Sequence, residues 1–262
     1  MNPSMLFVTL LALVSPTVST HTAAPALVVR QERSVRDRFV ELHAANDEAG
    51  CKKLWLDNRH EVLYTIDADL EGALATWEKS KAKPDSAAIA TMQARALWGA
   101  RLASEAFGHP IFLDYTSAFV SQNDAQKAQF RAGQKTHGES RQAMKAGDWK
   151  KAQEKARECI GNAAPLGDWW GHAMGLSALG AAFVGDKKPA EAIQPLGEAA
   201  LIYRDLGLVG DEYGELRLLA RCLVDTGAKE RAKAVIARAI ELAKLLGDDK
   251  GASELSELAK SL

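Results

Sequence analysis

Apolar residues recur at intervals of three and four along most of the chain, and this spacing is typical of amphipathic helices. No run alternates apolar and polar residues for long enough to predict a strand. In the first half, the breaks between predicted helices fall at Asn46-Asp47, Asn58-x-x-Glu61, Lys83-Pro84-Asp85, Gly108-His109-Pro110 and Asn123-Asp124. Asn58-x-x-Glu61 has the form of a capping box. The sequence therefore predicts an all-α fold.

The second half of the chain repeats itself every 40 residues. Leu166-Gly167, Leu206-Gly207 and Leu246-Gly247 stand one such step apart. The same step relates Ala152, Ala192 and Ala232; Cys159, Ala199 and Ala239; Leu176 and Leu216; and Leu179 and Leu219. A fixed period of this length indicates stacked units, each of which buries its apolar face against its neighbours. Helix breaks are expected near the glycines at 147, 167, 185, 207, 227 and 247.

Each unit is predicted to form two helices and resembles the tetratricopeptide repeat (TPR). Leu176-x2-Leu179-Gly180-x2-Phe183, followed by Ala192-x3-Leu196, is similar to that family's W-x2-L-G-x2-Y and A-x3-F patterns. The unit from Leu216 to Ile236 repeats the arrangement. The resemblance covers about residues 125–262. It implies an α-solenoid of antiparallel helix pairs, with extra helices at the N-terminus.

The repeat departs from the family in its length and in one turn. The usual period is about 34 residues, so this chain looks like the longer-helix variety, as in kinesin light chains. The turn at Gly185 is shifted relative to the turns at Gly147 and Gly227. HEAT and armadillo repeats also run near this length and are the alternative. The five-residue step from Gly147 to Ala152, which recurs from Gly227, favours the TPR interpretation.

The sequence divides into three parts. Residues 1–26 carry no charged side chain, and Met5 to Val14 is an apolar run too short to span a bilayer. Together with Ala24-Pro25-Ala26, this segment resembles a secretory signal, and cleavage is expected between about Thr20 and Leu27. The mature chain is then exported, periplasmic or secreted, without stable membrane insertion. A buried N-terminal helix is the alternative.

The remaining two parts are helical. Residues 27–122 form an N-terminal region that is either a set of degenerate repeats or a cap, and the sequence leaves both open. Residues 123–262 form the repeat domain. The 33 basic residues balance 34 acidic ones, which removes the electrostatic case for nucleic-acid binding. The three cysteines lack the spacing of a zinc site, and Cys159 is expected to be a small core residue.

No catalytic or cofactor motif is present, so we assign no catalytic, cofactor-binding or metal residues and expect a non-enzymatic protein. One near-motif, Asp67-x-Asp69-x-Glu71-Gly72 with Glu78, approaches a calcium loop. The apolar periodicity runs through this segment, which favours an uninterrupted helix over a cation-binding loop.

The resemblance also suggests a binding surface, because the first helices of such repeats line a concave face that binds peptides. A basic stripe of His137, Arg141 and Lys145 lies on the first of these helices. The equivalent positions one and two repeats later are Ser177 and Ala181, then Arg217 and Arg221. We expect this surface to bind an acidic segment or a C-terminal carboxylate. An ordinary solvated face is the alternative.

Trp169 and Trp170 begin the second unit and serve either repeat packing or anchoring of a partner. The leading hypothesis is thus an exported scaffold or adaptor that binds a protein or peptide. A second hypothesis is a helical enzyme or ligand sensor, with a site around Trp55, Trp77 and Trp98. A third is an architectural subunit that self-assembles through an end of the solenoid.

Overall fold

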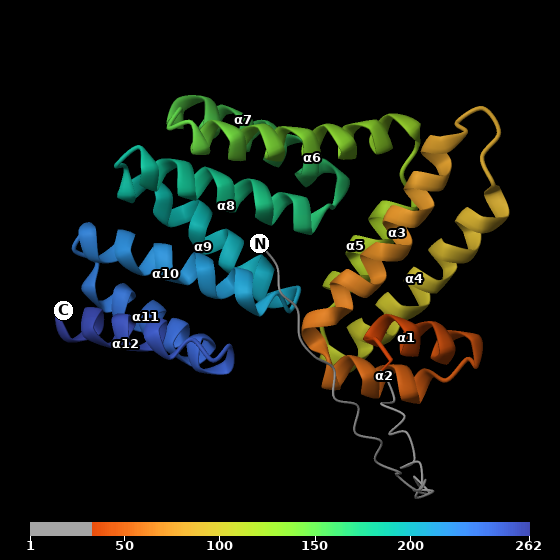
Figure 1. The fold of residues 1–262 in the computed structure, drawn as a ribbon, viewed down its shortest axis with the longest axis horizontal. Helices are drawn as coiled ribbons and strands as arrows, with labels where there is room; N and C mark the ends of the chain where they lie inside the picture. The colour runs from red at the N-terminus through yellow and green to blue at the C-terminus, as the bar shows by residue number, and fades with distance from the viewer. Residues whose placement is uncertain (1–32) are drawn as a thin grey trace, which may run out of the picture. The chain divides into compact units, whose positions relative to one another are not determined.

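The computed structural model describes residues 33–262, so the expected signal segment 1–26 lies outside the described residues. Residues Ser34–Leu262 form one compact unit. The described residues contain helices and no strand, and neighbouring helices pack consecutively as antiparallel pairs (Figure 1). The predicted all-α, solenoid-like fold is therefore confirmed. Within the same residues, no helix is both long and apolar enough to traverse a bilayer.

The first five helices follow the breaks predicted from the sequence. They are α1 (Val35–Ala44), α2 (Glu48–Asp57), α3 (Val62–Lys79), α4 (Ser86–Phe107) and α5 (Ile111–Val120). Ser34 caps α1 by accepting a hydrogen bond from the backbone of Asp37. The predicted capping box at Asn58 is wrong: its side-chain amide donates to the carbonyl of Leu54 at 2.9 Å, while a short 3-10 turn fills 59–61. The amide completes the end of α2 instead of starting α3.

The repeat region consists of seven helices. They are α6 (Asp124–Lys145), α7 (Trp149–Ala163), α8 (Trp169–Gly185), α9 (Pro189–Asp205), α10 (Val209–Asp225), α11 (Lys229–Leu245) and α12 (Asp249–Lys260). A capping box of Asn123 and Gln126 starts α6. Figure 1 shows α8 lying between α6 and α10, so that the first helices of successive units are neighbours. Five of the six expected glycines lie in the turns between these helices, and Gly185 is the last residue of α8, directly before a turn.

Equivalent positions of the repeat have equivalent burial. Ala152, Ala192 and Ala232 are fully buried, as expected for residues at close helix contacts. Cys159 is also buried, as a small core residue. Gly180 illustrates the close approach of α8 and α9, because an added Cβ there would lie 2.5 Å from the side chain of Leu196. The small residues are thus what allows paired helices to pack at short distance.

The turn between α8 and α9 corrects one expectation. Gly147 and Gly227 adopt positive φ values of 73° and 75°, and Lys187, at the equivalent repeat position, adopts 59°. The turn is therefore in register with the other two, and only its glycine is displaced, to Gly185. The reason is the antiparallel pairing of α8 and α9, which requires a left-handed residue at this position whatever its side chain.

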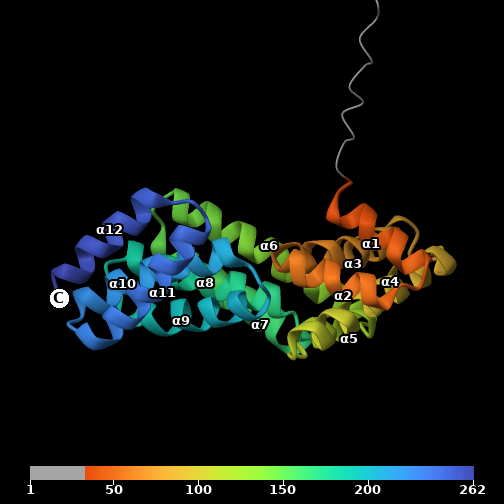
Figure 2. The same ribbon diagram turned by 90° about the horizontal axis from the view of Figure 1, so that it is seen from below.

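The N-terminal helices pack directly on the repeat region (Figure 2). One hydrophobic core extends from Phe39 to Leu208 and includes residues of both regions. Arg131 on α6 forms ion pairs with Glu71 and Glu78 on α3, at 2.8 and 2.9 Å. These contacts fix the orientation of α3 beside the first repeat helix.

The segment that resembles a calcium loop is part of the continuous helix α3, as the periodicity predicts. Its carboxylates have protein partners. Asp69 is fully buried and binds Arg36 on α1 and Arg95 on α4, at 2.7 and 2.6 Å. The acidic residues of α3 therefore join helices together, in the geometry of a helix rather than a loop.

Candidate binding site

A cavity of about 380 Å³ opens on the face where α6, α8 and α10 meet the N-terminal helix α3, and we call it the central pocket. Its volume is in the range of pockets that hold small ligands or single side chains. Its lining comprises Tyr64, His137, Arg141, Met144, Trp170, Met174, Ser177, Ala178, Ala181, Tyr203 and Asp211.

Helical spacing explains why these residues converge. His137 and Arg141 are one turn apart on α6, and Trp170, Met174 and Ser177 follow at intervals of four and three on α8. Residues at such spacings share one face of a helix. Because α6 packs beside α8, the two faces meet at the pocket.

The central pocket brings together five of the nine residues proposed from the sequence. They are His137, Arg141, Trp170, Ser177 and Ala181. Lys145 is exposed at the end of α6 and does not line the pocket. The expected basic stripe therefore ends at Arg141, and Met144, not Lys145, is the next residue of α6 that lines the pocket.

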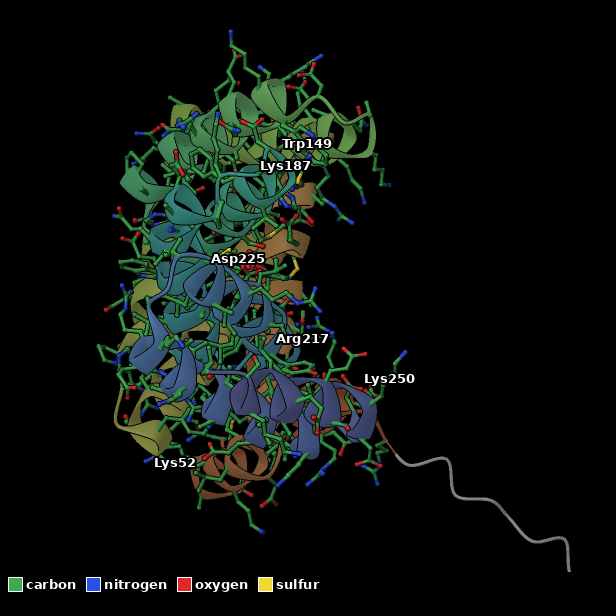
Figure 3. All side chains as sticks on the ribbon, turned by 90° about the vertical axis from the view of Figure 1, so that its left-hand side faces the viewer. Lys52, Trp149, Lys187, Arg217, Asp225 and Lys250 are labelled. Carbon is green, nitrogen blue, oxygen red and sulfur yellow. The ribbon has the colours of Figure 1, made fainter. Side chains whose placement is uncertain are left out.

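Arg217 and Arg221 belong to a different cavity of about 590 Å³ between α10 and α12, the terminal cavity. Arg217 pairs with Glu254 at 3.4 Å and lies over the ring of Tyr213, 5.4 Å from its centroid. Figure 3 shows Arg217 and Lys250 on the same side of the stacked helices. The structure thus places the two basic patches in separate cavities, so they do not flank one common floor.

The two tryptophans at the start of α8 have different roles. Trp170 lines the central pocket and meets Tyr64 edge to face, with ring centroids 5.6 Å apart. Trp169 is 38% exposed and stacks on His172, with centroids 6.3 Å apart. Only Trp170 is positioned to contact a molecule in the central pocket.

The tryptophans of the alternative N-terminal site are packed between helices. Trp55 is fully buried and donates its indole N–H to the carbonyl of Gly99 at 3.1 Å. Trp98 lies 5.9 Å from the ring of Phe39. Trp77 is covered by the ammonium groups of Lys81 and Lys127, at 4.8 and 4.6 Å from its ring centroid. Their contacts are those of core residues.

Sequence reasoning missed the polar residue that adjoins the pocket floor. Glu215 on α10 is only 7% exposed, and its Oε1 accepts a 2.6 Å hydrogen bond from the hydroxyl of Ser177 on α8. Among the described residues, no donor lies within hydrogen-bonding distance of its second oxygen, Oε2. One signal was available: Glu215 stands at i, i+4 and i+7 with Leu219 and Cys222, within an apolar stripe of α10.

Burial sets the charge states around the pocket. It raises the pKa of Glu215 to about 7, although the hydrogen bond from Ser177 acts in the opposite direction. Burial also lowers the pKa of His137, and the nearby charge of Arg141 lowers it further. At neutral pH the pocket therefore contains a largely neutral imidazole and the cation Arg141, and Glu215 beside it is roughly half ionised.

Comparison with known proteins does not identify the chain: no protein-family model matches it, and no curated protein is significantly similar to it. In the described residues, no group of three or more histidine, cysteine or acidic side chains is arranged to hold a metal ion. The central pocket thus combines the cation of Arg141 with aromatic and methionine side chains, and the buried carboxyl group of Glu215 lies behind Ser177.

Proposed function

We propose that this protein is an exported, non-enzymatic scaffold of the long-period TPR type that binds a protein or peptide at the central pocket. The observation that carries the proposal is the position of the pocket across α6, α8 and α10. These are the first helices of three successive units, the surface on which TPR-like proteins are expected to bind peptides. The 40-residue period and the antiparallel helix pairs support the same interpretation.

The side chains of the pocket suit peptide recognition. Arg141 is exposed, and among the described residues it has no ion-pair partner, so its guanidinium is available to an acidic group of the partner. Bidentate hydrogen bonds make arginine well suited to a carboxylate. The small side chains of Ser177 and Ala181 leave room for an extended chain to approach α8. Trp170 supplies an aromatic surface of the kind common at binding hot spots.

Selection of short peptides on the full-length protein tests the proposal. Peptides enriched from a random library are measured for affinity against the wild type and against Ala181→Phe, which fills the pocket. Ala190→Phe is the matched control, because Ala190 is an exposed helical alanine on α9, outside the central pocket. We expect a loss of affinity of at least tenfold for Ala181→Phe and less than twofold for Ala190→Phe.

Two results would contradict the proposal. Failure to enrich any peptide on the folded protein would remove peptide binding as its function. Equal affinity of the enriched peptides for both phenylalanine variants would exclude the central pocket as the site. Circular dichroism of each variant establishes that the helices are intact.

A further inference from the structure

The side of the central pocket formed by α10 is acidic, in contrast to the basic groove expected from the sequence. Asp211 lines the pocket, and Glu215, one turn further along α10, is held against Ser177 in the pocket lining. Three aromatic residues, Tyr64, Trp170 and Tyr203, line the same cavity. Carboxylates combined with aromatic rings are the features that proteins use to recognise organic cations.

The buried carboxylate of Glu215 is incompletely satisfied. Ser177 binds Oε1, but within the described part of the chain Oε2 has no hydrogen-bond partner. A buried charge without a partner is unfavourable unless a cation or further donors compensate it. A positively charged ligand in the adjacent pocket would supply that compensation, because opposite charges attract more strongly beside the low-dielectric protein interior than in bulk water.

We infer that the central pocket holds a cationic group of the bound peptide, an ammonium or a guanidinium, against Asp211 and the rings of Tyr64 and Trp170, with the buried charge of Glu215 attracting it from behind Ser177. This inference rests on the proposed peptide-binding function and specifies its ligand. Arg141 on α6 lies on a different helix from these carboxylates and pairs with an acidic neighbour in the same peptide. The recognised segment therefore carries a basic residue beside an acidic one.

Binding of a cation beside Glu215 depends on pH. Glu215 must be ionised to attract the cation, and its pKa of about 7 places this ionisation near neutrality. The groups around it are Ser177 on α8, Tyr203 on α9 and Asp211 on α10, with His137 and Arg141 on α6 lining the same pocket. Burial and the charge of Arg141 lower the pKa of His137, which disfavours its protonation. Affinity for the cationic peptide therefore rises as the pH increases from 6 to 8.

A positional-scanning library of acetylated hexapeptides tests this specificity on the full-length protein. Lysine, arginine, norleucine or glutamate is fixed at each position in turn, and binding of each sublibrary is measured at pH 8. We expect lysine or arginine to exceed norleucine by at least tenfold at one position. A parallel set with free N-termini distinguishes a side-chain cation from a terminal ammonium: preference for the free terminus, with no side-chain preference, assigns the cation to the terminus.

Glu215→Gln supplies the decisive variant, since it keeps the size of the side chain and removes the charge. We expect it to abolish the preference for the cation and the rise in affinity between pH 6 and pH 8. Glu230→Gln, at a side chain 86% exposed on α11, is the matched control and should change neither. Peptide binding that Ala181→Phe blocks, but that shows no preference for a cation, would overturn this inference and leave the proposed function intact. Absence of any peptide binding would overturn both.

Discussion

Ser177 on α8 donates a 2.6 Å hydrogen bond to Glu215 on α10, and this contact joins the first helices of two successive repeat units through side chains. Stacked helix pairs pack mainly through apolar and small residues, so a buried carboxylate at this position is unfavourable for stability. Glu215 is therefore an exception to the apolar packing between units. The central pocket lies beside it.

The first prediction concerns the loss of stability caused by burying the carboxylate of Glu215. Burial raises the pKa of Glu215 from 4.5 to about 7, so the folded protein favours the protonated form. The contribution of protonated Glu215 to the free energy of unfolding is fully present below pH 4.5 and is lost as the pH rises through 7. Glu215→Gln removes this dependence. We expect the variant to exceed the wild type in free energy of unfolding by about 1–3 kcal/mol at pH 8, with little difference at pH 4.5.

Urea denaturation at the two pH values measures this difference. Glu230→Gln again serves as the control, because its side chain is 86% exposed and pairs with Lys233 at the surface, so removal of its charge should change the free energy of unfolding by about 0.5 kcal/mol or less at both pH values. A wild type that is more stable than Glu215→Gln at pH 8 would show that a cationic partner or water already compensates the carboxylate in the free protein.

The second prediction concerns the N-terminal helices. Asp69 is fully buried and receives hydrogen bonds from Arg36 and Arg95, which connect α3 with α1 and α4. Asp69→Ala leaves two guanidinium groups without their carboxylate and should destabilise the protein by about 3 kcal/mol or more. Asp57→Ala removes only a 51% exposed carboxylate paired with Lys53, for an expected loss of about 0.5 kcal/mol or less. Equal losses for the two variants, measured by denaturation, would contradict a structural role for Asp69.

The third prediction concerns the turn between α8 and α9. Lys187 adopts a φ of 59°, which is unfavourable for a residue with a Cβ, so Lys187→Gly should stabilise the protein by about 0.5–1 kcal/mol. Gly227→Ala is the reverse experiment at the equivalent turn. A Cβ there would meet no atom within 4 Å, so its expected cost of about 1 kcal/mol comes from backbone conformation alone. Thermal unfolding of both variants checks the pair, and a destabilised Lys187→Gly would refute it.

The fourth prediction concerns the first residues of the chain. The uncharged segment 1–26 predicts cleavage between about Thr20 and Leu27 and export of the remainder. Mass spectrometry of the protein from its native source measures the mature N-terminus directly. An N-terminus in this interval, in an extracytoplasmic fraction, supports export. An intact Met1 in a cytosolic fraction would contradict it.

Helix order was predictable because the repeat and the turn residues are local signals. Gly147, Gly167, Gly207, Gly227 and Gly247 all lie in turns with positive φ, as their spacing indicates. The position of Gly185 predicts a shifted turn, but the pairing of α8 and α9 fixes the left-handed residue at Lys187. Lys187, two residues after the displaced Gly185, takes the left-handed conformation.

The binding site was only partly predictable. His137, Arg141 and Ser177 could be placed on one surface because the 40-residue period relates helix to helix. The period does not reveal that Tyr64, from outside the repeat, lines the same pocket, since that depends on how α3 packs beside α6. Nor does it reveal that Glu254 pairs with Arg217, since that ion pair depends on how the side chains of α10 and α12 face each other.

The most direct test of the account is photo-crosslinking from inside the central pocket. A photoreactive phenylalanine analogue replaces Met174 in the pocket, Ser253 in the terminal cavity, or Ala190 on α9, and each protein is irradiated with an enriched peptide. Mass spectrometry then measures the yield of crosslinked peptide at each position. The account predicts a crosslink from position 174 and background yield from positions 253 and 190. A crosslink from position 253 with none from 174 would contradict it and place the binding site between α10 and α12.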